Sequence, residues 1–194
     1  MPHSAGLADI VLTSPRLSMS AFVREDIAEI AAPIAPSIYR FIHWEGWPTA
    51  TGMPGIWQDW LDMSGRGTGL VLVLRRRDRR DVVGICGMHF LDTAEPTAGL
   101  WIRDSMQGQG YGSEAMAALT AWAFGERGAR GVYFPVFDQH EPSRRIAERL
   151  GGAPADGDPR VRAPLYRGAM ELYRIPLPHA QPAPHRTARR GTAP

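Results

Sequence analysis

The first third of the chain carries apolar residues at the spacing of one strand and two short helices. Residues 17–23 alternate apolar and polar positions, which predicts an opening strand. Apolar residues at helical spacing over 27–31 predict a helix, and Pro33 then ends that pattern. A second helix is expected from about 55 to 63, within a stretch that is rich in aromatic residues.

Three apolar runs follow and predict adjacent strands. GLVLVL (69–74) and VVGICGMHF (82–90) flank the charged connection RRRDRRD, a pattern that is typical of a hairpin with a solvated turn. TAGLWIR (97–103) predicts a third strand. An apolar-periodic helix is expected from about 111 to 125.

The last third continues the alternation of strand and helix. VYFPVF (132–137) predicts a strand, and a helix from about 142 to 150 ends at a pair of glycines. Residues 153–162 read as a polar loop, and 163–177 as one or two closing strands. The order of elements predicts an α/β protein with a mixed central sheet in a single domain.

Length and composition narrow the class of protein. A chain of 194 residues that is 44% hydrophobic can bury one sizeable core. We find no signal peptide at the start, and no apolar stretch reaches the roughly 18–20 residues that span a bilayer. The single cysteine, Cys86, excludes an internal disulfide and fits a reducing compartment. We therefore expect a cytoplasmic protein that does not enter the membrane.

The charge of the chain is concentrated in its last residues. All 22 basic residues are arginines, because the chain contains no lysine. The segment 177–194 holds Arg186, Arg189 and Arg190 and no acid, so the net charge of the remainder falls from +2 to −1. A segment rich in Pro, Ala and Arg cannot build a core. We expect a folded domain over 1–176 and a disordered tail over 177–194, which could contact RNA or simply remain solvated.

The stretch QGQGYGSEA (107–115) places three glycines directly before the helix expected from residue 111. Glycines let a backbone approach a ligand closely, and the first N–H groups of a helix attract anions. This stretch does not match the dinucleotide fingerprint or the lysine-containing phosphate loop. It does match the pattern Q-x-x-G-x-G, with Gln107, Gly110 and Gly112 at the fixed positions.

With three further segments, that motif resembles the GNAT superfamily of acyl-CoA-dependent N-acyltransferases, and within it the Rim-type branch, which acetylates protein N-termini and small amines. The further segments are TSPRLSM (13–19), GLWI (99–102) and SRRIAERLGG (143–152). The resemblance covers the chain up to about residue 176. It implies a single-domain GNAT-like fold, with splayed middle strands and helices on both faces of the sheet.

The resemblance also implies how acetyl-CoA, the acyl donor, binds, with no metal required. Backbone amides of residues 107–113 would hold its pyrophosphate, and its pantetheine arm would lie along the strand 97–103. Pro135, which has no N–H, fits the strand that should splay away, although a bulge without ligand is the alternative. An N–H at or near Ile102 would stabilise the oxyanion. The implied donor-binding residues are Ile102, Gln107, Gly108, Gln109, Gly110, Tyr111, Gly112 and Ser113.

The residues expected to move protons follow the Rim-type pattern with two departures. Ser143 stands where a serine can protonate the leaving thiol, although it could instead cap the helix. His140 replaces the usual asparagine and could contact pantetheine, act as a base, or lie on the surface. Thr97 stands where relatives often carry a glutamate base, so Glu95 becomes the candidate base. Cys86 lies in an apolar strand and is expected to be structural.

The acceptor amine should bind against the aromatic stretch 38–63. Trp44 and Trp47 flank Glu45 in an expected loop, and together they could bind a cationic amine. Trp57 and Trp60 lie at helical spacing, which favours a place in the core. An α-amine, whose pKa is about 7.7–8, needs less help from a base than a lysine amine.

The leading hypothesis is an acetyl-CoA-dependent N-acetyltransferase that transfers directly to a protein N-terminus or a small primary amine. A toxin-like or resistance enzyme of this fold would use aminoacyl-tRNA or an antibiotic as acceptor, so a nucleic-acid partner stays open although it is not favoured. A CoA-binding regulatory module without turnover is the alternative from another class. The assembly is expected to be a monomer or a homodimer.

Overall fold

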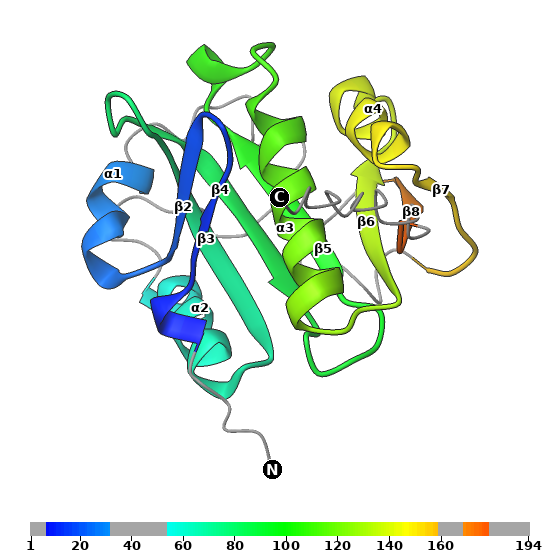
Figure 1. Cartoon of the computed structure of the whole chain (residues 1–194), viewed down its shortest axis with the longest axis horizontal. Helices are drawn as coiled ribbons and strands as arrows, with labels where there is room; N and C mark the ends of the chain where they lie inside the picture. The colour runs from blue at the N-terminus through cyan, green and yellow to red at the C-terminus, as the bar shows by residue number, and fades with distance from the viewer. Residues whose placement is uncertain (1–6, 32–53, 159–168, 179–194) are drawn as a thin grey trace, which may run out of the picture.

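A computed structural model describes residues 7–31, 54–158 and 169–178 of the chain. Its elements agree with most of the sequence predictions, as Figure 1 shows. The helices and strands are η1 (Leu7–Asp9), β1 (Val11–Thr13), β2 (Leu17–Ala21), η2 (Arg24–Asp26), α1 (Ile27–Ala31), α2 (Pro54–Arg66), β3 (Gly69–Arg76), β4 (Val82–His89), β5 (Thr97–Ile102), η4 (Asp104–Met106), α3 (Tyr111–Glu126), β6 (Gly131–Phe137), α4 (Glu141–Arg149), β7 (Ala153–Pro154) and β8 (Met170–Pro176).

The strands form one mixed sheet in the order β1-β2-β3-β4-β5-β6-β8-β7. Every neighbouring pair is antiparallel except β5 and β6, which are parallel. The predicted α/β fold with a mixed central sheet is confirmed. Two short strands were not predicted: β1 precedes the expected opening strand, and β7 lies within the segment expected to be a loop.

Helices cover both faces of the sheet. On one face, α3 and α4 bury Met116, Leu119 and Ala147 against alternate residues of the strands. On the other face, α1 and α2 bury Ile30 and Trp57 against the remaining alternate positions. Figure 1 shows α3 crossing in front of the sheet, with α4 beside β6. We call these the α3 face and the α2 face.

The two predicted tryptophans of α2 belong to the core. Trp57 is buried, and its ring lies 5.0 Å from that of Trp60 and 5.7 Å from that of Phe22, measured between centroids. The charged connection between β3 and β4 is a hairpin turn, as predicted. At its start, Arg75 forms ion pairs with Asp26 and Glu29. No helix in the described part of the chain is both long enough and apolar enough to cross a membrane.

Candidate active site

The sheet opens between β5 and β6. These strands share a single registered pair, Thr97 with Tyr133, and the Tyr133 N–H donates to the Pro96 carbonyl at 2.8 Å. The other edge of β5 is paired with β4 at six positions, from Ile102 with Gly84 to Thr97 with His89. Beyond Thr97, therefore, β5 presents an open edge toward β6.

The backbone groups on this open edge follow from the alternation of a strand. The Pro96 carbonyl points to β6, and the Arg103 N–H donates to the Val83 carbonyl of β4. Even-numbered residues of β5 therefore direct their backbone groups toward the opening. Leu100 and Ile102 are therefore the residues available to a ligand laid along this edge. The Ile102 carbonyl accepts a hydrogen bond from Gln107 Nε2 at 2.9 Å, which leaves its N–H as the donor on that residue.

Pro135 lies on the opposite side of the opening. Because the Tyr133 N–H points to β5, the nitrogen of Pro135, two residues later, also faces β5 rather than β8. The proline thus removes no hydrogen bond from the ladder with β8. Its missing N–H denies β6 a donor toward β5, at the place where the two strands separate.

The glycine loop lies at the end of β5 and leads into α3. Gly108 and Gly110 have φ angles of +73° and +84°, values that favour glycine strongly. Gly110 is the N-cap of α3 and offers no side-chain hydrogen bond to the helix. The first N–H groups of α3, on Tyr111, Gly112 and Ser113, have no partner within the helix and can bind an anion.

The side chains of the two loop glutamines hold the loop rather than extend from it. Gln107 Nε2 donates to the Ile102 carbonyl and, at 3.2 Å, to Asp104 Oδ1. Gln109 Nε2 donates to the Ser105 carbonyl at 3.1 Å. We infer that these two residues shape the phosphate cradle, while the backbone N–H groups remain for the ligand.

Arg16, from the TSPRLSM segment, fixes the loop from outside. Its guanidinium donates to the Gln109 carbonyl at 2.9 Å and to Glu114 at 2.7 Å, and it lies 4.4 Å from the centroid of the Tyr111 ring. Ser14 Oγ also donates to Glu114, at 2.6 Å. Burial opposes ionisation of Glu114, but hydrogen bonds from Ser14 and from the backbone and side chain of Arg16 outweigh it and lower the pKa of Glu114. Arg16 lies in the TSPRLSM segment, and no local signal in the sequence indicates its positioning role.

The second half of α4 packs against α3 and β5 beside the same opening. A Cβ placed on Gly112 would be 3.0 Å from Ile146 Cδ1 and 3.1 Å from Leu100 Cδ2, so α3, α4 and β5 converge here. Arg149 of α4 donates to Ser113 Oγ of α3 at 3.4 Å. The absence of a side chain at Gly112 permits this close approach.

His140 and Ser143 form a hydrogen-bonded pair at the start of α4. His140 Nδ1 lies 2.8 Å from Ser143 Oγ, and burial lowers the pKa of His140, so the imidazole is neutral at pH 7. The N-cap residue of α4 is His140, and no side chain caps the helix. The hydroxyl of Ser143 is therefore engaged with the imidazole and does not serve as a helix cap.

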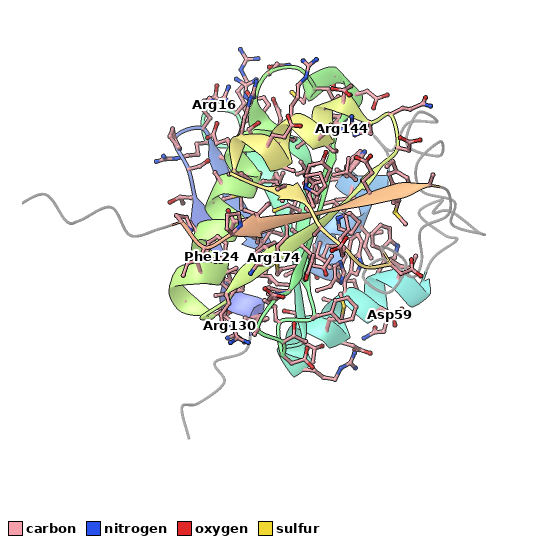
Figure 2. The ribbon with its side chains drawn as sticks, turned by 90° about the vertical axis from the view of Figure 1, so that its right-hand side faces the viewer. Arg16, Asp59, Phe124, Arg130, Arg144 and Arg174 are labelled. Atoms are coloured by element: carbon pink, nitrogen blue, oxygen red, sulfur yellow. The ribbon has the colours of Figure 1, made fainter. Side chains whose placement is uncertain are left out.

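Glu95 lies at the other, closed end of β5. Its carboxylate accepts hydrogen bonds from Arg174 at 2.6 and 2.9 Å. These contacts lower the pKa of Glu95, which makes it a weaker base. The ion pair therefore argues against Glu95 as the proton acceptor. Figure 2 shows the separation: Arg16, beside the glycine loop, lies near the top of the view, and Arg174, the partner of Glu95, lies below it.

Two further predictions can be located. Cys86 is buried, and burial raises the pKa of its thiol to about 12, so it is a structural residue and no nucleophile. Trp44, Glu45 and Trp47 lie outside the described residues. Among the residues that are described, no group of three or more His, Cys, Asp or Glu side chains is arranged to hold a metal ion.

Comparison with known proteins identifies the class of this site. The family model of the acetyltransferase (GNAT) domain matches residues 16–153, which is most of the chain. The chain therefore belongs to the GNAT acetyltransferase family, and the resemblance found in the sequence is confirmed. A search of curated protein sequences gives no significant match.

Solved structures with the same fold include Rim-type proteins. RimJ of Mycobacterium smegmatis, in complex with a CoA-disulfide, superposes with a TM-score of 0.73 at 18% identity, over 90% of this chain and 92% of that one. RimL, a ribosomal L7/L12 alpha-N-protein acetyltransferase in complex with coenzyme A, gives 0.73 at 14% identity, over 87% and 98%. An acetyltransferase from Agrobacterium tumefaciens gives 0.68 at 20% identity, over 90% and 98%.

Proposed function

We propose that this protein is an acetyl-CoA-dependent N-acetyltransferase that transfers the acetyl group directly to a primary amine. The observation that carries the proposal is the open edge of β5. The glycine loop follows this strand and leads into α3, and the His140–Ser143 pair stands at the start of α4. The glycine loop would bind phosphate, the open edge would pair with an extended amide chain, and the His140–Ser143 pair could donate a proton.

The residues of the chain divide this work among them. N–H groups of residues 108–113 would hold the pyrophosphate of acetyl-CoA, which supplies the thioester. The pantetheine arm would pair first with the backbone of Ile102 and then with that of Leu100 as it runs from the loop. The candidate oxyanion donor therefore moves from Ile102 to the Leu100 N–H, near the end of the arm. These backbone groups need no particular side chain, so the binding depends on the shape of the loop and the strand.

Ser143 is the proposed proton donor for the leaving thiolate. As the C–N bond forms and the C–S bond breaks, Ser143 Oγ would pass its proton to the sulfur, and the amine nitrogen would give up one proton. Ser143 would then be reprotonated from solvent, so the protons balance. His140 would hold the hydroxyl in position through the 2.8 Å contact. Direct transfer is favoured over an acyl-enzyme because the only thiol of the chain, Cys86, is buried with a raised pKa.

A protein α-amine is the proposed acceptor. RimL acts on the α-amine of a ribosomal protein, and its fold is shared here. An α-amine is partly neutral at pH 7–8, which suits a site whose former candidate base, Glu95, is held in an ion pair. Trp44, Glu45 and Trp47 remain predicted contacts of this acceptor.

The test has two stages. Calorimetric titration of the full chain with acetyl-CoA should give one site with a Kd of roughly micromolar order. Release of CoA is then followed with peptides that begin with Ser, Ala or Met, each beside its Nα-acetylated counterpart, and with spermidine, an aminoglycoside and an aminoacyl-tRNA. We expect turnover with free α-amines only. Binding of acetyl-CoA without turnover on any acceptor would favour a CoA-binding regulatory module instead. Absence of acetyl-CoA binding would overturn the proposal.

A further inference from the structure

Two glycines face each other on the α2 face, beside the open edge of β5. Gly87 of β4 is registered opposite Gly99 of β5. Within the part of the chain that the structure describes, no atom comes within 4 Å of a Cβ built on Gly99. The surface of β5 is therefore uncovered by described side chains at the residue next to Leu100, where the open edge begins.

His89 borders this uncovered surface. It lies on β4 two residues after Gly87, on the same face, and its Nε2 is 3.8 Å from a Cβ built on Gly87. Residues two apart on a strand are roughly 6.6 Å apart, so an approach of 3.8 Å means that the imidazole leans back along β4 toward Gly87. No hydrogen bond or ion pair engages the His89 side chain within the described ranges.

Thr97 lies on β5, two residues before Gly99 and on the same face. It is registered directly opposite His89, and only 3% of its surface is exposed. Its Oγ1 is buried and has no hydrogen-bond partner in the described part of the chain. Buried hydroxyls are usually satisfied, so an unpaired one indicates a place where a ligand or water completes the bonding.

We propose that His89 is the catalytic base that accepts the proton of the acceptor amine, with Thr97 as a hydrogen-bond partner for that amine. This inference rests on the proposed function. As the amine nitrogen bonds to the acetyl carbon, one of its protons passes to His89 Nε2, and the C–S electron pair leaves with the sulfur. His89 then returns the proton to solvent after the amide departs, so no further reactant is needed.

The surroundings of His89 suit this role. Burial lowers its pKa, so the imidazole is neutral and able to accept a proton at pH 7. Asp26 of η2 and Glu29 of α1 pair with Arg75, and Glu95 pairs with Arg174. On α2, Asp62 accepts a hydrogen bond from Gln58, and Asp59 is exposed. Tyr133 of β6 lies across Thr97 on the same face, and the Cys86 side chain of β4 points to the α3 face.

The open edge indicates which part of the donor meets His89. The edge runs from the glycine loop at Ile102 back to Thr97, where β5 rejoins β6. A chain that lies along it from the phosphate cradle ends beside residues 98–100. That end adjoins Gly99. Because Gly99 has no side chain, nothing on β5 would separate His89 from the acyl carbon there.

The experiment compares His89→Gln with the wild type, using the serine-starting peptide as acceptor and acetyl-CoA as donor. We expect kcat to fall about 100-fold, while the Kd for acetyl-CoA measured by calorimetry changes less than about twofold. The pH profile separates a base from a packing residue. Wild-type kcat should fall as the pH drops through the lowered pKa of His89, below 6.5, and His89→Gln should lose that limb.

Two further variants keep the test decisive. His185→Gln, a matched change in the C-terminal segment, should leave rates and pH profile unchanged. His89→Gln combined with Thr97→Glu should recover at least about tenfold of the lost kcat, because a carboxylate then stands on the same face. If the single variant fails to fold, the imidazole NMR titration of the wild type decides. His89 and His140 should both titrate below 6.5, so the titration is repeated on His140→Gln. The one low-pKa imidazole that remains should shift when the peptide is added.

The outcomes are separable from those of the proposed function. A wild type that does not bind acetyl-CoA contradicts the acetyltransferase proposal itself. A wild type that transfers acetyl groups while His89→Gln matches it in kcat and pH profile overturns the role of His89 alone. In the NMR titration, a set of histidines that all ignore the peptide overturns it as well.

Discussion

The two edges of β5 differ in how fully they are hydrogen-bonded to a neighbouring strand. Along one edge the strand is registered with β4 at six positions, and along the other with β6 at one. The paired edge holds β5 in the sheet, so the open edge can remain without a partner and still keep its shape. A ligand that supplies hydrogen bonds there completes a surface that the fold has already positioned.

Single residues maintain each edge. Gly84 lies where β4 and β5 approach so closely that a Cβ on it would be 2.1 Å from the Trp101 carbonyl oxygen. Pro135 faces the open edge and has no N–H to offer it. A small residue thus permits pairing on one side, and a residue without a donor discourages it on the other.

The largest expected effect comes from the paired edge. Gly84→Ala should lower the free energy of unfolding by about 3 kcal/mol, because the added methyl group collides with backbone that cannot move aside. Urea denaturation measures the change. Gly99→Ala is the matched control, since it adds the same methyl group to the neighbouring strand, and it should cause no loss of stability. Equal losses in both variants would contradict the contrast between the two positions.

Filling the phosphate cradle should affect binding more than folding. Gly110→Trp places a large side chain, at a positive φ, among the first N–H groups of α3, so we expect acetyl-CoA to bind at least about 100-fold more weakly. Gly125→Trp, at an exposed position near the other end of α3, is the control and should bind normally. Retained affinity in Gly110→Trp would show that the glycine loop is not the phosphate site.

Removal of the proposed proton donor should slow turnover and leave binding intact. Ser143→Ala is expected to lower kcat about 10- to 100-fold without changing the KM for acetyl-CoA, because the hydroxyl acts only when the thiolate leaves. Ser143→Thr keeps the hydroxyl and should retain most of the rate. An equal effect on KM in Ser143→Ala would indicate a binding role instead.

The sequence predicted those parts of the molecule whose signals are local. The predicted strand over 132–137 and helix over 111–125 agree with β6 and α3 within a residue, because alternation and helical spacing report burial directly. The glycines and the start of α3 were found together for the same reason, since loop and helix are contiguous. Pro135 was also interpreted correctly as a residue of the strand that splays.

What the sequence did not reveal depends on residues that are far apart in the chain. The position of Glu95 near β5 suggested a base. Its ion-pair partner, Arg174, comes from β8, and no pattern near either residue in the sequence indicates that the two meet. Arg16 reaches Glu114 across 98 residues. His89 sits at the end of an apolar run, and its relation to Thr97 is set by the register of β4 and β5.

A smaller effect is expected from Arg16, which supports the loop from outside. Arg16→Ala should weaken acetyl-CoA binding roughly tenfold, because the Gln109 carbonyl and Glu114 lose the guanidinium that fixes them. The effect is modest since the Arg16 side chain is 47% exposed. Arg66→Ala, at an exposed position at the end of α2, should have no effect on affinity. Wild-type affinity in Arg16→Ala would mean that the loop holds its shape unaided.

The smallest effect should follow Pro135→Ala. Because the nitrogen of residue 135 faces β5, the ladder between β6 and β8 stays intact, and the free energy of unfolding should change by less than about 0.5 kcal/mol. A clear gain in stability, measured by denaturation without ligand, would indicate that β6 had closed onto β5. That result would identify the proline as the residue that keeps the sheet open.

Amide hydrogen exchange along β5 tests the central claim most directly. Without ligand, the N–H groups of Gly99 and Trp101, which face β4, should exchange slowly, and those of Leu100 and Ile102 should exchange fast. Saturating acetyl-CoA should slow Leu100 and Ile102 at least about tenfold and leave the other two unchanged. Unchanged exchange at Leu100 and Ile102 with acetyl-CoA bound would contradict the account, because the donor would then lie elsewhere than on the open edge.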